Sequence, residues 1–218
     1  MAAICDAVIN LCAVRVTRLD ALGNPSAGPN NFYVSNKPLS IAVTPEIEAG
    51  RDLTLVGGCD CIVASYRGPD KLKRFTFQVD IAKLEPGLIE MMIGASAILS
   101  GTSTDPIGLW YPQQLSCDDP VQPNVALEGW QYLWEDDHQA TDYPYCHWIW
   151  PSTRWQIGTH TLNNDFLQPQ LNGFSRGNPE WGTGPYGDMP EAAEPQGGFF
   201  FDTQIPTAAC GYQTNSVT

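Results

Sequence analysis

The sequence predicts an all-β protein, for three reasons. Eighteen prolines and twenty glycines among 218 residues are too many for a helical bundle, and they suit short strands joined by turns. The chain is 43% hydrophobic and 11% aromatic, which favours a packed core over disorder. Apolar side chains alternate with polar ones in several segments, which is the period of a strand with one buried face.

The first strands are expected between residues 14 and 43. Val14 and Val16 alternate with Arg15 and Thr17, which indicates a strand with an apolar face and a polar face. We assign the two valines to the core. A stretch rich in Gly, Pro and Asn then forms a turn, and alternation resumes over residues 33–43.

The clearest alternation in the chain lies between residues 75 and 81. Four apolar side chains are separated there by three polar ones, so we expect a strand with one face in the core. The apolar set is Phe75, Phe77, Val79 and Ile81, and the polar set is Thr76, Gln78 and Asp80. Shorter strands are expected before it, at residues 53–55 and 59–66.

A single short helix is predicted between Glu85 and Gly94. The proline after Glu85 needs no amide partner at the first helical position, and Gly94 can adopt the left-handed conformation that ends a helix. Leu88, Met91 and Met92 share one helix face and are expected in the core.

After Gly94 the composition shifts toward Pro, Gly, Asn and Trp. We expect one domain over residues 1–218, with residues 100–128 as an insertion or extended loop within it. Long structureless loops in a compact domain usually serve function or contact a neighbour. Strands are expected to return at residues 130–134, 146–150, 155–162 and 199–201, with residues 172–198 largely loop.

The net charge of −13 is unevenly distributed along the chain. Residues 1–94 hold nine Lys and Arg against ten Asp and Glu, whereas residues 95–218 hold only Arg154 and Arg176 against fourteen acids. One interpretation is an ordinary solvated surface. The other is the wall of a DNA conduit, since an acidic wall repels phosphates. Both interpretations disfavour binding to a nucleic-acid backbone.

Compartment and cysteine use point to the cytosol, or to a particle assembled there. Asp6 interrupts the apolar residues 1–14, no basic segment precedes them, and residues 91–99 are too short to cross a bilayer. Seven cysteines form an odd set, which argues against a secreted disulfide framework. We expect Cys59 and Cys61 to be small buried hydrophobes rather than metal ligands, and disulfide formation by any cysteine is left open.

Two short motifs could carry chemistry, but neither has suitable geometry. Residues 135–138 (Glu-Asp-Asp-His) could bind a hard cation, yet neighbours on an extended segment point in alternating directions. Cys146 and His147 could form a nucleophile–base pair, yet consecutive strand residues face opposite sides. We therefore predict no catalytic residue, no cofactor and no metal, and a protein that is not an enzyme.

Five tryptophans allow two interpretations. At i, i+2 spacing, aromatic side chains share one strand face, as in the stacking platform of a carbohydrate-binding module. Alternatively they fill a core or pack between subunits, which we favour because Ile149 between two of them is also apolar. The five are Trp130, Trp134, Trp148, Trp150 and Trp155.

Three segments in the first 95 residues carry a resemblance to a known family. They are V-x-R-L-D-x-x-G-N-P from Val16, S-N-K-P-L-S-I from Ser35 followed by P-E-I-E-A-G, and L-x-P-x-L-x-x-x-x-x-G from Leu84, with weaker echoes at residues 150–155 and 182–188. In this order they resemble the major tail tube proteins of bacteriophages with long, non-contractile tails (siphophages).

The resemblance implies a tail-tube-like antiparallel β-sandwich or half-barrel, with one short α-helix and long interlocking loops. It implies that six subunits form a ring and that rings stack into the virion's tail tube, assembled in the host cytoplasm, through which DNA is ejected without specific binding. The implied partners are further copies of the chain and the tape-measure, tail terminator and distal tail proteins, with no membrane.

The candidates for positions between subunits or facing the lumen are Arg15, Thr17, Thr76, Gln78 and Asp80, and which of them face the lumen is left open. Residues 100–128 depart from the family pattern and are expected on the tube exterior. Two alternatives remain: another virion structural protein, such as a capsid decoration or head–tail connector protein, and a carbohydrate-binding module.

Overall fold

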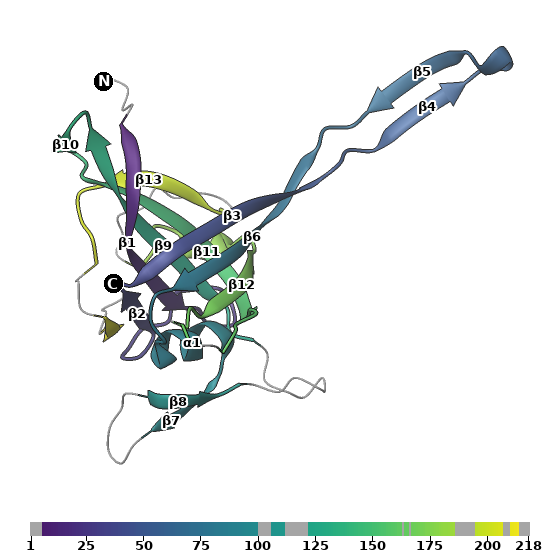
Figure 1. Cartoon of the computed structure of the whole chain (residues 1–218). Coiled ribbons are helices and arrows are strands. Elements are labelled where there is room, and N and C mark those ends of the chain that lie inside the picture. Colours follow the sequence, from purple (N-terminus) through teal and green to yellow (C-terminus); the bar gives the residue numbers. More distant parts are fainter. Residues whose placement is uncertain are drawn as a thin grey trace.

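The computed structural model describes residues 6–99, 106–111, 122–162, 164–165, 167–185, 195–206 and 210–213. Over these residues the chain is mainly antiparallel β-structure with one α-helix, so the all-β prediction is confirmed (Figure 1). The strands are β1 (Ala7–Arg18), β2 (Phe32–Ser35), β3 (Pro38–Glu48), β4 (Asp52–Val56), β5 (Ile62–Arg67), β6 (Lys71–Ile81), β7 (Ser96–Leu99), β8 (Pro106–Trp110), β9 (Val125–Glu135), β10 (His138–Gln139), β11 (Tyr145–Ile157), β12 (Gln170–Ser175), β13 (Gly198–Asp202) and β14 (Gly211–Gln213).

Ten strands form one curved sheet. Its main path runs β14-β2-β1-β9-β11-β12-β6-β3, with β10 added beside β9 and β13 beside β11. Strand β3, at one end of this path, also contacts β1 near the other end. The sheet therefore curls into a half-barrel that does not close, because no ladder joins β3 to β1.

The core fills the inside of this curl. Phe77, Val79 and Ile81 project into it from β6, and Trp150 and Trp155 from β11. Eight of the nine residues predicted in the core are buried in this cluster, and Phe75 is half-buried against it. The eight are Val14, Val16, Phe77, Val79, Ile81, Leu88, Met91 and Met92.

Helix α1 (Pro86–Ile93) closes one end of the half-barrel and packs against β1, β2 and β11. It begins after Glu85 with proline at its first position, and it ends at Gly94, where φ is 71°. The amide of Gly94 donates to the carbonyl oxygen of Glu90 at 2.9 Å. Both predicted boundaries of the helix are therefore confirmed.

Several boundaries differ from the prediction. Residues 125–128, expected in an extended loop, lie in the middle of the sheet in β9. Residues 146–157 form one unbroken strand, and β12 occupies part of the expected loop 172–198. In the expected insertion, residues 106–110 form β8, which pairs with β7, while residues 100–105 and 112–121 lie outside the described part of the chain.

Candidate assembly surfaces

A two-stranded arm projects from the body of the molecule (Figure 1). The arm comprises residues 46–74. The ladder between β3 and β6 runs out of the body as far as Glu48 and Lys71, and β4 and β5 continue it from Asp52 and Arg67. Every residue of β4 and β5 is exposed.

Two glycines allow the strands of the arm to approach closely where β3 and β6 give way to β4 and β5. A Cβ at Gly50 would overlap the carbonyl oxygen of Gly68. The amide of Gly68 donates to the carbonyl oxygen of Arg51 at 2.9 Å, and the amide of Gly50 donates to Oδ1 of Asp70 at 2.9 Å. Any larger residue at position 50 would separate the strands at this joint.

The arm is amphipathic. Cross-strand partners in an antiparallel ladder share a face. In the four pairs nearer the body, the apolar face carries Leu53–Tyr66 and Leu55–Ala64, and the opposite face carries Asp52–Arg67 and Thr54–Ser65. Beyond a bulge, the last pair toward the tip, Val56–Ile62, is apolar as well. Leu55 and Tyr66 are each 61% exposed. An isolated two-stranded hairpin is marginally stable in water, and the described residues leave this apolar face uncovered.

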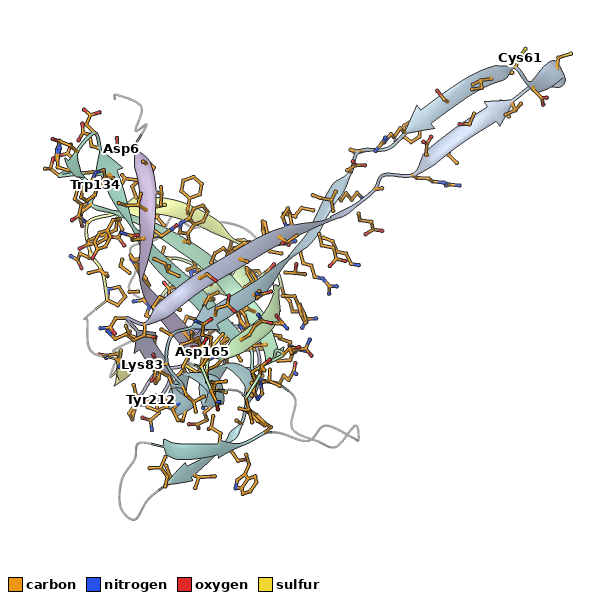
Figure 2. All side chains as sticks on the ribbon, in the orientation of Figure 1. Asp6, Cys61, Lys83, Trp134, Asp165 and Tyr212 are labelled. Atoms are coloured by element: carbon orange, nitrogen blue, oxygen red, sulfur yellow. The ribbon has the colours of Figure 1, made fainter. Side chains whose placement is uncertain are left out.

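The tip of the arm contradicts the expectation for its two cysteines. Cys59 lies in a 3-10 turn rather than in a buried strand, and Cys61 directly follows that turn. Both side chains are exposed. Figure 2 shows Cys61 at the far end of the arm, remote from the body. The amide of Gly57 donates to the carbonyl oxygen of Cys61 at 2.7 Å, which closes the turn.

Charge also distinguishes the arm from the rest of the chain. Residues 46–74 contain five of the eleven Lys and Arg and five of the twenty-four Asp and Glu, so the arm is neutral. The remaining residues hold six basic against nineteen acidic side chains and carry the whole net charge of −13. The arm can thus approach an acidic copy with less repulsion than residues 75–218, which carry three basic against seventeen acidic side chains.

An apolar groove of about 580 Å³ opens on the body at the seam where the half-barrel fails to close. Strand β3 pairs only with β6, and residues 7–13 of β1 pair only with β9, among the described strands. Both of these unpaired edges border the groove. Its apolar lining consists of Leu11, Ile41, Val43, Phe75, Trp148, Trp150 and Phe199, and its polar side chains are Ser40 and Gln131.

Most of the tryptophans are structural. Trp150 and Trp155 lie in the core against Phe77, and Trp130 is buried on the other face of the sheet. Trp148 is half-buried in the groove, where its Nε1 donates to Oε1 of Gln131 at 2.8 Å. The core-filling interpretation is confirmed for the three buried tryptophans.

On the face of the sheet opposite the core, a buried network of charged residues joins four strands. Nε and Nη2 of Arg15 each donate to a carboxylate oxygen of Glu128 at 2.6 Å. Nε2 of His147 lies 3.2 Å from Oε1 of Glu128, and its Nδ1 lies 3.3 Å from Oδ2 of Asp202. Trp130 stacks on the imidazole with ring centres 3.9 Å apart. The network therefore joins β1, β9, β11 and β13.

The network sets the protonation states of its members. Burial would raise the pKa of Glu128, but the charges and hydrogen bonds of Arg15 and His147 hold it at about 2. Burial would lower the pKa of His147, but hydrogen bonds to Asp202 and Glu128 outweigh it and raise the pKa above its ordinary value.

This network corrects part of the sequence-based assignment. Arg15 and Thr17 do face away from the core, but they are only 5% and 0% exposed within the protomer. Their side chains are buried within the protomer and are therefore not available to face a lumen. No local pattern around Arg15 could have revealed Glu128, which lies 113 residues further along the chain.

The three polar residues of β6 remain accessible. Gln78 is exposed, and Thr76 and Asp80 are half-buried on the face opposite the core. Oγ1 of Thr76 donates to the carbonyl oxygen of Thr44 at 3.2 Å, and Asp80 accepts from Oγ of Ser40 at 2.8 Å. Their assignment to a lumen or a subunit contact stays a prediction.

The two motifs considered for chemistry have other settings. Residues 135–138 lie at the turn between β9 and β10, and within the described residues no group of three or more His, Cys, Asp or Glu is placed to hold a metal ion. Cys146 and His147 face opposite sides of β11, since the thiol packs with Leu133 and Ala140 while the imidazole joins the network. Burial raises the pKa of Cys146 to about 11, which keeps the thiol protonated at neutral pH.

No family model matches the chain. A comparison with curated proteins finds no match either. Over the part of the chain that the structure describes, no helix is both long and apolar enough to cross a membrane.

Sequence reasoning recognised strands in the arm but missed its significance. A signal was available, because the alternating segments 52–56 and 62–67 lie between two glycines, Gly50 and Gly68, around a five-residue turn region. The sequence does not indicate whether a third strand covers this hairpin.

Proposed function

We propose that this chain is a structural subunit of a phage tail tube, which assembles as stacked hexameric rings and conducts DNA. The observation that carries the proposal is the arm, whose apolar face has no cover from the described residues of its own chain. Burying a large apolar side chain contributes roughly 1.5–3 kcal/mol, so Leu53, Leu55 and Tyr66 together favour a complex strongly.

Two unpaired strand edges support the same proposal. Exposed edges promote pairing with other chains, and proteins usually shorten, charge or cover them. Among the described strands, one edge of the eleven-residue β3 is unpaired, and so is one edge of the first half of β1. A neighbouring subunit is the natural cover for such edges in a protein that polymerises.

The acidic balance of the chain suits the passage of DNA. In this proposal Thr76, Gln78 and Asp80 are the candidates for the lumen, because they remain on an accessible polar face. The face that carries Thr76 and Gln78 also holds Arg74 and Arg154, so the weak hold on DNA in this proposal rests on the excess of acidic side chains over the whole chain. The further partners are those that the resemblance implies: tape-measure, tail terminator and distal tail proteins.

Electron microscopy of the purified protein tests the proposal. We expect tubes of constant width at high protein concentration. A chain that stays monomeric at high concentration would refute self-assembly, and discrete trimers or dodecamers would favour a decoration or connector protein instead. Saturable quenching of tryptophan fluorescence by one class of glycan, without assembly, would favour the carbohydrate-binding alternative.

A further inference from the structure

The groove and the arm are two uncovered apolar surfaces of one chain, and we propose that the groove of each copy receives the arm of the next. This inference rests on the proposed function, since it names the surface through which copies associate. The groove is open at a seam, is lined by seven apolar side chains and contains no charged lining residue. It therefore suits an apolar occupant rather than an ion or a sugar.

The arm matches the groove in chemistry and size. Its apolar face presents aliphatic side chains and one tyrosine, and it extends for about five residues, or roughly 17 Å. The groove volume of about 580 Å³ accommodates a few such side chains rather than a whole domain. The unpaired edges of β1 and β3 beside the groove also offer backbone groups to an added strand.

Electrostatics favours the arm over the acidic residues 75–218 of a second copy. The body carries the full charge of −13, so two bodies repel each other, whereas the neutral arm approaches without that repulsion. The groove lining itself contributes only the neutral polar side chains of Ser40 and Gln131. When the arm covers the groove and displaces water from it, no charged side chain of the lining is buried without a partner.

The arm of the same chain cannot occupy its own groove. Ile41, Val43 and Phe75 line the groove from the base of the same β3–β6 ladder that carries the arm, and the arm points away from the body (Figure 1). The contact must therefore join different patches on two copies. Such a heterologous contact repeats and generates a ring or an open polymer rather than a closed two-fold dimer.

Two variants separate the two halves of this contact. Leu55→Asp places a charge on the apolar face of the arm, and Phe199→Asp places one at the rim of the groove. Both positions are exposed, at 61% and 56%, so both variants should fold. Leu22→Asp, at a 76% exposed residue remote from both surfaces in the sequence, is the matched control for the added charge.

Sedimentation velocity of each variant and of mixtures is the experiment. We expect wild type and Leu22→Asp to polymerise, and Leu55→Asp and Phe199→Asp alone to remain monomeric with native melting temperatures. An equimolar mixture of the two inactive variants should form dimers and nothing larger, because only one intact arm and one intact groove can meet. Val43→Asp, a second groove variant on a different strand, should behave like Phe199→Asp.

Other results would overturn the assignment in distinguishable ways. Polymerisation of folded Phe199→Asp and Val43→Asp would exclude the groove while leaving the proposed function intact. Loss of assembly in Trp110→Asp with normal assembly in both groove variants would assign the arm's receptor to the exposed β7–β8 hairpin. Monomeric wild type and control at high concentration would refute the proposed function and this inference together.

Discussion

Replacing Glu128 with glutamine should lower the free energy of unfolding by about 3 kcal/mol at neutral pH. The carboxylate is fully buried and is bound by Arg15 and His147. Glutamine keeps the volume of the side chain but removes the negative charge that forms an ion pair with the buried Arg15 guanidinium.

Two routes give the same magnitude. The pKa of Glu128 is about 2 in the folded protein against an ordinary value of 4.5. That difference corresponds to about 3 kcal/mol at neutral pH. Independently, breaking a buried ion pair by removing one partner costs about 3–5 kcal/mol.

Urea unfolding followed by tryptophan fluorescence measures this difference. Glu135→Gln, at an exposed position of the same strand, is the control and should change the free energy by less than about 0.5 kcal/mol. In the wild type, the contribution of Glu128 is present above pH 4.5 and is lost as the pH falls toward 2. Equal unfolding midpoints for Glu128→Gln and wild type at pH 7 would show that the network does not stabilise the fold.

Four further outcomes are expected. Because the pKa of His147 is raised, its charged contacts should contribute fully below pH 6.5 and fade as the pH rises through the raised value, so His147→Gln should flatten that part of a stability profile. Gly50→Val should leave the melting of the body unchanged but prevent tube formation seen by electron microscopy, since it separates the strands at the joint of the arm. Phe77→Asp should abolish soluble expression, because it places an unpaired charge in the core; unchanged melting would contradict the assigned register. Assembled tubes should not retain duplex DNA at low salt, and strong, salt-reversible retention in a pull-down assay would contradict an acidic lumen.

The elements that the sequence predicts correctly are those fixed by local chemistry. Residues 75–81 alternate cleanly because one face of β6 meets the core and the other meets solvent. Helix α1 begins at a proline and ends at a glycine, and both signals act within one turn of the chain. Neither prediction depended on knowing which strands lie beside these elements.

The errors arise where a residue's environment depends on distant parts of the chain. Arg15 has the pattern of an exposed residue, but the pairing of β1 with β9 places Glu128 beside it, and its guanidinium lies over the Trp130 ring. Cys59 and Cys61 were expected to be buried because cysteine usually is, yet they occupy a tip that nothing described covers. The groove combines residues from six strands, so no single segment of the sequence reveals it.

The continuity of β3 and β6 from the core to the arm has a mechanical consequence. A force applied along the arm acts parallel to β3 and β6. It therefore shears the ladder between β6 and β12, so the hydrogen bonds of that ladder bear the force together instead of breaking one after another. A filament linked through such arms would resist stretching until whole ladders gave way at once. Single-filament extension should therefore produce abrupt ruptures in place of gradual yielding.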